Sequence, residues 1–496
     1  MIRSTARFRF LHWLLVVLVA LSSGVLTTRL DAADDRPNVL LILADNWKWP
    51  NAGALGDSLA KTPTFDRIAR EGVLFTHVFN PVPSCSPTRS CLLTGRYAHE
   101  IGERASLHSG FPKDTPVMTD LLRAAGYQTG YSGKPWGPGN HEVSGWKENP
   151  VGTKFTSFEA FLKQTETSRP FFFWLGNTDT ATKAGRLPYL DRASSTLSAG
   201  QMPIPPELPD CPELRQDLLN YYGGIMTMDD EAGAAIRELE DRGLLDKTIV
   251  IYASDNGWQM PRGLANCYDA GSRVPMAIRW GQQLKPGRVV DAFINNAEIG
   301  PTILELTGIA RPPEMTLPGF SDLLLDQAAS SDASSVDREC VFIERERHAD
   351  VRRDHLGYPM RAIRTRDFLY VRNLRPDRWP AGDSDILFLH GRPFGDVDTT
   401  GVKDVLLAHL DDPEFAKFRR LIFDKRPGEE LYDLKSDPHQ IHNVAHQSAY
   451  AAKITELRLR VDDWMQATND PRVDSESNVF DTYPYYGKPA PRRPEK

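Results

Sequence analysis

Two acid–amide pairs stand where apolar runs of the sequence end, at positions suited to binding a cation. Asp45-Asn46 closes one apolar run, and Asp255-Asn256 closely follows another. Carboxylate and amide oxygens are the ligands that hard divalent cations such as Ca²⁺ take. A single pair of this kind more often caps a turn after a strand. Two such pairs in one chain favour a shared metal site.

A cysteine, a proline and an arginine at close spacing form the second group that could do chemistry. The segment is Cys85-Ser86-Pro87-Thr88-Arg89, and Leu-Leu-Thr-Gly-Arg follows it at 92–96. A buried thiol beside a proline turn is the alternative, because free cysteine often serves as a small hydrophobic residue. The whole stretch resembles the signature of the sulfatase family, which is Cys-x-Pro-x-Arg, a leucine-rich turn and Thr-Gly-Arg. The continuation at 92–96 favours this resemblance over the alternative.

The resemblance implies that Cys85 is the precursor of the nucleophile. In the sulfatase family a maturation enzyme oxidises this cysteine to formylglycine. The aldehyde hydrates to a geminal diol, and one diol hydroxyl attacks sulfur. The resemblance also implies one Ca²⁺, which would act as a Lewis acid on the sulfate oxygens and lower the pKa of the diol. Its implied ligands are Asp45, Asn46, converted Cys85, Asp255 and Asn256.

The resemblance adds Arg89 and Lys134 to Cys85 as catalytic residues. Lys134 lies in the segment 132–139, directly after an apolar strand. There it would place a fixed positive charge on a sulfate oxygen and stabilise the transition state. The alternative is a solvated loop lysine without a role in catalysis.

The chain also departs from the family pattern at positions that matter for catalysis. Asn46 replaces the usual second acid, so we expect a weaker metal site. Ala181 stands where a histidine commonly assists the leaving group, and Leu264 stands where a second lysine or arginine is usual. We predict that Arg262, two residues from Leu264, and His348 bind the substrate. For His348 a solvated charge cluster is the alternative.

Three segments resemble the N-sulfoglucosamine sulfohydrolase (heparan N-sulfatase) branch of the family, namely 126–134, 173–176 and 358–364. The branch implies a sulfuric ester or sulfamate hydrolase that acts on sulfated carbohydrate. The departures leave two alternatives open. One is a non-catalytic relative that binds sulfated glycans, and the other is a phosphate- or phosphonate-ester hydrolase. If the chain hydrolyses sulfated sugars normally, Arg262, Lys183 and His348 are the first candidates to supply the missing groups.

Strands that alternate with helices predict an α/β domain with a large, mostly parallel sheet covered by helices on both faces. The resemblance makes this fold alkaline-phosphatase-like. In such sheets, sites gather at the carboxyl ends of the strands. Shorter strands and one helix predict a smaller C-terminal α+β domain. We place the catalytic domain at 34–360 and the C-terminal domain at 361–496.

The first residues predict export from the cell. Arginines precede the apolar run 11–21, which is typical of a signal peptide over 1–33, with an uncleaved anchor as the alternative. No later segment is long and apolar enough to span a bilayer. No Asn-x-Ser/Thr sequon occurs, which favours a bacterial periplasmic or extracellular protein over a lysosomal one.

Charge and cysteine content narrow the range of partners. The net charge of -7 argues against a nucleic-acid-binding protein, while local basic patches could still receive a sulfated ligand. The expected partners are a sulfated carbohydrate and a formylglycine-generating enzyme. If Cys85 is converted, four of the five cysteines remain, and three disulfide pairings stay open.

Overall fold

The computed structural model describes the chain from residue 36 to residue 488, with gaps at 167, 184, 327–337 and 475. The signal peptide predicted over 1–33 lies outside the described residues. Within them, no helix is both long enough and apolar enough to cross a membrane. All five cysteines lie within the described residues, and no disulfide bond joins them.

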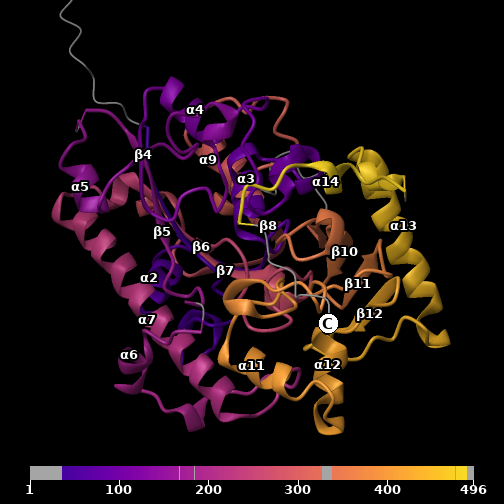
Figure 1. Ribbon diagram of the computed structural model, residues 1–496. Coiled ribbons are helices and arrows are strands. Elements are labelled where there is room, and N and C mark those ends of the chain that lie inside the picture. The colour runs from indigo at the N-terminus through magenta and orange to yellow at the C-terminus, as the bar shows by residue number, and fades with distance from the viewer. Residues whose placement is uncertain (1–35, 167, 184, 327–337, 475, 489–496) are drawn as a thin grey trace, which may run out of the picture.

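The large domain is built on an eight-stranded sheet (Figure 1). Its strands are β1 (Asn38–Ala44), β2 (Val73–Phe79), β3 (Gln128–Gly133), β4 (Thr153–Lys154), β5 (Phe171–Asn177), β6 (Thr248–Ser254), β7 (Arg273–Arg279) and β8 (Arg288–Asn295). The strand order is β4-β3-β5-β1-β6-β7-β2-β8, and β7 alone among these strands runs antiparallel to its neighbours. The predicted α/β fold with a mostly parallel sheet is confirmed.

Helices cover both faces of this sheet. One face of β1 packs with α2 (Pro63–Glu71), α5 (Phe158–Leu162) and α7 (Pro212–Asp241). The other face packs with α3 (Cys85–Thr94), α4 (Met118–Ala124) and α9 (Ile299–Leu306). The remaining helices are α6 (Leu190–Ser194), α8 (Asp269–Ser272), α10 (Ser321–Leu324), α11 (Gly401–Ala408), α12 (Ala416–Ile422), α13 (Ala451–Ala467) and α14 (Val479–Thr482). Burial on both faces explains why the central strands are continuous apolar runs.

The register of β1 brings the two acid–amide pairs together. Ala44 at the end of β1 lies beside Ser254 at the end of the parallel strand β6. The next residues, Asp45 and Asp255, therefore leave the sheet at the same edge. The backbone N–H of Asp255 donates to the carbonyl of Ala44 at 3.0 Å, which fixes this alignment.

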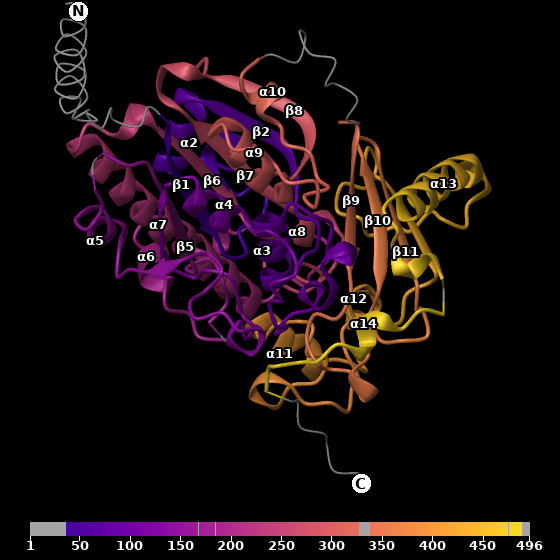
Figure 2. The same cartoon turned by 90° about the horizontal axis from the view of Figure 1, so that it is seen from above.

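The C-terminal domain carries a smaller antiparallel sheet beside the large one (Figure 2). Its strands are β9 (Cys340–Arg345), β10 (Met360–Thr365), β11 (Phe368–Asn373) and β12 (Glu429–Asp433), in the order β12-β11-β10-β9. Apolar residues of α13 pack on one face of this sheet. Because β9 precedes residue 360, the smaller sheet begins earlier than the predicted second domain. The boundary itself stays a prediction.

A buried carboxylate of the smaller sheet holds a segment of the large domain. The Glu344 oxygens accept from the backbone N–H groups of Ala98 and His99 at 2.8 and 3.1 Å. The His99 ring nitrogen Nδ1 also lies 3.0 Å from Glu344. These contacts join two parts of the chain that are about 245 residues apart in sequence.

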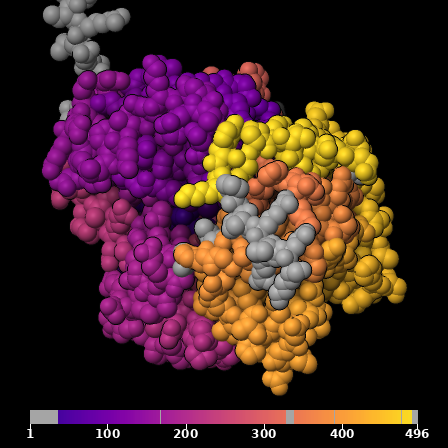
Figure 3. Space-filling view, in the orientation of Figure 1, coloured from indigo at the N-terminus to yellow at the C-terminus, as the bar shows by residue number. Residues whose placement is uncertain are grey.

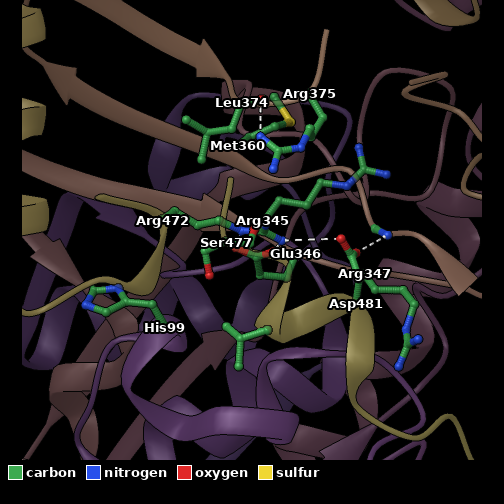
Figure 4. Close-up of polar contacts among 12 residues, drawn as sticks. His99, Arg345, Glu346, Arg347, Met360, Leu374, Arg375, Arg472, Ser477 and Asp481 are labelled. Carbon is green, nitrogen blue, oxygen red and sulfur yellow. Dashed lines mark hydrogen bonds and ion pairs between the residues drawn. The ribbon is translucent and has the colours of Figure 1, made fainter. Parts of the chain in front are cut away.

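A second set of buried charges ties the C-terminal residues to β10. The Arg361 guanidinium donates to Asp470 at 2.5 and 3.0 Å and to Glu346 at 2.8 Å. Arg472 also donates to Glu346 at 2.7 Å and lies 3.9 Å from Asp481 (Figure 4). Because these groups are fully desolvated, each charge depends on its partners.

Arg361→Met should therefore destabilise the protein strongly. The change leaves the buried carboxylates of Glu346 and Asp470 short of one positive charge. Loss of one partner from a buried ion pair lowers the free energy of unfolding by about 3–5 kcal/mol. Urea unfolding followed by circular dichroism measures it. Arg353→Gln, at an exposed ion pair with Asp385, is the control and should change stability by less than about 1 kcal/mol. Equal stability of both variants would contradict this account.

Candidate active site

Cys85 is the first residue of α3, and the whole of this helix is buried. Its core contacts include Leu92 and Leu93, and the carbonyl of Leu92 lies so close to Gly300 of α9 that any side chain there would collide. Gly95, with a φ of 59°, ends the helix in the left-handed conformation. Tight packing thus fixes the position of the Cys85 side chain at the helix start.

The Cys85 thiol faces the two acid–amide pairs. Its sulfur lies 3.9 Å from Asn46 Oδ1. The Sγ of Cys85 and one carboxylate oxygen each of Asp45 and Asp255 all lie within 4.8 Å of one another. Burial raises the pKa of the Cys85 thiol, and the Asp45 carboxylate adds to this effect. An unmodified thiol here therefore stays protonated, which makes it a poor nucleophile.

Arg89 and Lys134 neutralise the two carboxylates. Arg89 Nε donates to Asp255 Oδ2 at 2.9 Å, and Arg89 Nη2 lies 3.5 Å from Asp45 Oδ1. Lys134 Nζ donates to the same Asp45 oxygen at 2.5 Å. Burial would raise the pKa of Asp45, but Lys134 and Arg89 outweigh it and lower that pKa. Burial together with the adjacent Asp45 raises the pKa of Asp255.

These residues fit a hard divalent cation. Asp45, Asn46, Asp255 and Asn256 all present oxygen atoms from the same edge of the sheet. The amide oxygen of Asn256 is buried and has no hydrogen-bond partner among the described residues. A buried acceptor without a donor is uncommon in proteins, and a cation would satisfy it. A cation would also favour the charged form of Asp255.

Asn46→Asp should tighten Ca²⁺ binding, because it adds a carboxylate to a set of hard-cation ligands. We expect the dissociation constant to fall about tenfold, measured by calorimetry on chelator-treated protein. Asn51→Asp is the control, since Asn51 is also buried but bonds Asp57 and Tyr222 instead. Absence of metal binding in both the wild type and the Asn46 variant would overturn the shared site.

The segment after β3 carries Lys134 and also holds the side chain of Arg89. Arg89 Nη1 donates to the carbonyls of Lys134 and Pro135 at 2.8 and 2.9 Å. Trp136 is 2 % exposed, and its ring N–H donates to Ser90 of α3 at 2.8 Å. The tryptophan thus anchors the segment against α3.

The structure separates the two predicted substrate residues. The ring nitrogen Nδ1 of His348 lies 2.8 Å from the hydroxyl of Ser84, the residue before Cys85. Burial lowers the pKa of His348 to about 4, so the ring is neutral at pH 7. The Arg262 guanidinium instead donates to the carbonyls of Leu421 and Gln440 in the C-terminal domain. We therefore do not retain Arg262 as a residue that binds substrate at Cys85.

Leu264 and Ala181 remain apolar positions near the site. Leu264 is 6 % exposed, and the next residue donates its backbone N–H to the carbonyl of Pro83, two residues before Cys85. Ala181 lines a small cavity together with Thr180 and Gln259. The hydroxyl of Thr180 donates to the carbonyl of Asp45 at 2.8 Å, which places this segment at the metal ligands.

Gln259 and Asp398, beside Ala181, form a pair that could not be predicted from the sequence. The Gln259 side chain accepts from the backbone N–H of Thr182 and donates to the carboxylate of Asp398. Burial raises the pKa of Asp398 to about 6. The 139 residues between Gln259 and Asp398 leave no sequence signal that links them. The Lys183 ammonium group donates a hydrogen bond to the hydroxyl of Thr178 at 3.2 Å. Lys183 remains a candidate for a positive charge near this segment.

Comparison with known proteins identifies the family. The sulfatase family model matches residues 37–141 and 138–309, which together make up more than half of the chain. The chain belongs to the sulfatase family. A second model, that of the C-terminal part of N-sulphoglucosamine sulphohydrolase, matches residues 262–374. The predicted relation to the N-sulfoglucosamine branch is thereby confirmed, as is the prediction of a sulfatase enzyme.

Individual relatives agree with this family. The human N-sulphoglucosamine sulphohydrolase is 28% identical over 493 residues, which cover 90% of this chain and 93% of that protein. An ulvan-active sulfatase of Formosa agariphila is 26% identical over 501 residues, covering 90% of this chain and 77% of the other. Both alignments extend over most of this sulfatase, including its C-terminal domain.

Solved structures share the fold. A structure in complex with D-glucosamine-2-N,6-O-disulfate has a TM-score of 0.60 and 19% identity, covering 89% of this chain and 100% of that one. The phosphonate monoester hydrolase of Agrobacterium radiobacter has a TM-score of 0.58 and 18% identity, covering 87% and 96%. At such identities the likeness establishes the fold alone, because enzymes of one fold differ in reaction.

Proposed function

We propose that this sulfatase is an exported, Ca²⁺-dependent hydrolase of sulfated carbohydrate that uses a formylglycine derived from Cys85. The observation that carries the proposal is the position of Cys85 at the start of α3, facing Asp45 and Asp255 with Arg89 and Lys134 beside them. Figure 3 shows a hollow between the large domain and the C-terminal residues, where we place the sugar. A bacterial periplasmic or extracellular location is part of the same proposal.

The substrate class is inferred from the relatives and from the second domain. The human relative is named for N-sulphoglucosamine, and one structure of the same fold was solved with a sulfated glucosamine. The C-terminal domain brings His348 to Ser84, next to Cys85. A sulfated amino sugar in the hollow would meet a neutral imidazole there, which can exchange hydrogen bonds with a hydroxyl or an amine.

The proposed metal would be held by Asp45, Asn46, Asp255 and Asn256. When bound, Ca²⁺ supplies Lewis-acid stabilisation of charge on sulfate oxygens. The protein's own cations have a separate task. Lys134 is held against Asp45 and can bind a sulfate oxygen with little reorganisation, which is the basis of electrostatic stabilisation in enzymes.

The decisive experiment is peptide mass spectrometry on the full chain after co-expression with a formylglycine-generating enzyme. We expect the peptide that contains residue 85 to carry an aldehyde, and the purified protein to hydrolyse a sulfated glucosamine. An unmodified thiol, under conditions that convert a known sulfatase, would overturn the nucleophile. A converted protein that hydrolyses phosphate or phosphonate esters faster than sulfate esters would overturn the substrate class.

Ala181 should make the reaction sensitive to the leaving group. A phenolate leaves unaided, whereas a sugar alkoxide needs a proton, and loss of a general acid slows such a reaction by about 10²- to 10⁴-fold. We expect a high ratio of aryl sulfate to sugar sulfate turnover, which Ala181→His should lower by accelerating sugar hydrolysis. Ala181→Gln adds similar bulk without a suitable acid and should leave the ratio unchanged. If the wild type already matches a histidine-bearing sulfatase on sugar sulfates, Asp398 or His348 would be the next groups to test.

A further inference from the structure

A second cavity, of about 440 Å³, lies where the large domain meets the C-terminal domain. Its walls come from the residues that follow β1, from α8 and the start of β7, and from the C-terminal domain around residues 364–366 and 434–440. Figure 2 shows α8 at this junction, on the side of the large domain that faces β9. The wall residues do not include Cys85, Arg89 or Lys134.

Positive charge predominates in the cavity wall. The wall contains the acids Glu207 and Asp269. Its lysine and arginine side chains are Lys48, Arg262, Arg273, Arg364 and Arg366. Arg364 is matched by Asp269, to which it donates two hydrogen bonds at 2.8 and 2.9 Å, and Arg273 lies 3.8 Å from the same carboxylate. Arg366 donates to Asp291 outside the wall at 3.1 Å. The ammonium group of Lys48 lies 4.1 Å from the ring centre of Trp258.

Buried N–H groups in the same wall have no acceptor. Arg262 is 3 % exposed and Arg273 is 7 % exposed. Among the described residues, the Nε atom of each has no hydrogen-bond partner. The ring N–H of Trp49 also has no hydrogen-bond partner among the described residues. The guanidinium carbon of Arg273 lies 3.6 Å from the centre of the Trp49 ring. More than nine in ten buried polar groups of native proteins find a partner. An acceptor in the cavity would be available to these three donors.

The titration of the wall residues agrees with an excess of positive charge. Burial lowers the pKa of Arg273 to about 10; Asp269 opposes this shift, while Arg364 and Arg366 add to it. Burial and the same three arginines lower the pKa of His77 to about 4. An anion in the cavity would oppose both shifts, since an opposite charge favours the charged form of each cation.

We propose that this cavity is a second oxyanion site, which binds a sulfate group either as free inorganic sulfate or as a substituent of a sugar. Arginine guanidinium groups suit such a ligand, because their forked N–H donors match tetrahedral oxyanions. The volume lies within the range of small-molecule sites and accommodates one sulfated monosaccharide. The inference goes beyond the proposed function, because binding here needs neither conversion of Cys85 nor turnover.

Calorimetry on the full chain can test this site apart from the catalytic one. The background carries Cys85→Ala and Lys134→Met, which prevents turnover and weakens sulfate binding at Cys85. In this background, Lys48→Met with Arg366→Gln removes two cations of the cavity wall. Lys285→Met with Arg353→Gln removes two exposed cations elsewhere and is the matched control. Inorganic sulfate and glucosamine 6-sulfate are titrated separately, and circular dichroism verifies folding of each variant.

We expect the cavity variant to bind its anion about tenfold more weakly than the background, because two charge-assisted contacts are lost. The control should bind within twofold of the background. If the cavity variant loses binding of both inorganic sulfate and glucosamine 6-sulfate, the site binds the sulfate group without needing the sugar. If it loses binding of glucosamine 6-sulfate only, the site binds sulfate as a substituent of a sugar. Equal affinity of the cavity variant and the control, or no binding by the background, would overturn the site. Should the double variant misfold, Arg366→Glu at the rim serves as the test.

Discussion

Cys85→Ala should abolish sulfate ester hydrolysis in protein that has been co-expressed with a formylglycine-generating enzyme. The side chain of Cys85 lies beside both carboxylates of the proposed metal site. Removal of the nucleophile from a covalent mechanism lowers kcat by roughly 10⁴-fold or more. The measurement is turnover of an activated aryl sulfate, which needs no leaving-group acid and so reports on the nucleophile itself.

The matched control for Cys85 is Cys91→Ala on the same helix. Cys91 is fully buried in a separate apolar cluster, so its replacement lowers stability and leaves the nucleophile in place. We expect Cys91→Ala to retain kcat within about tenfold of the wild type at a temperature where it is folded. If Cys85→Ala were as active as Cys91→Ala, hydrolysis would have to use another nucleophile.

Lys134→Met should give the second largest loss of activity. The lysine is held 2.5 Å from Asp45 and can place its charge on a sulfate oxygen without reorganisation. Removal of one such electrostatic contact lowers kcat by about 10²- to 10³-fold. The value of kcat should fall more than KM rises, because the contact strengthens as charge develops in the transition state.

The matched control for Lys134 is a lysine on the neighbouring strand. Lys154→Met removes an exposed lysine from β4, the strand next to β3, and should leave kcat unchanged. Lys134→Arg keeps the charge and should recover part of the activity, although its planar head group fits the contact with Asp45 less well. A Lys134→Met protein as active as Lys154→Met would show that the lysine only neutralises Asp45.

The local chemistry of this protein is visible in the sequence. Strands β1 and β6 are apolar throughout because they are buried on both faces, so their ends at Asp45 and Asp255 could be predicted. Parallel strands direct their carboxyl ends to one edge, and this places the two pairs side by side. Cys85 could also be predicted, because the residues of its motif are neighbours in sequence and lie together on α3.

Other parts of the site depend on contacts between segments far apart in the chain. Arg262 could not be assigned from sequence, because its acceptors at Leu421 and Gln440 lie 159 and 178 residues away. The role of Trp136 as an anchor on Ser90 of α3 likewise depends on a contact between separate segments. A buried polar side chain takes the conformation in which its polar atoms find hydrogen-bond partners. The sequence does not show which partners lie near it in the folded protein.

The sequence by itself thus predicted Cys85 as the nucleophile, with Arg89 and Lys134 beside it, through its resemblance to the sulfatase signature. It also predicted the ends of the strands that carry the acid–amide pairs, because strand burial leaves a pattern in the chain. Only the tertiary structure decided that His348 reaches Ser84, that Gln259 joins Asp398 to the segment of Ala181, and that a cationic cavity forms at the domain junction. The physical reason is that the C-terminal domain supplies one side of each contact, and its orientation is set by packing that involves the whole chain.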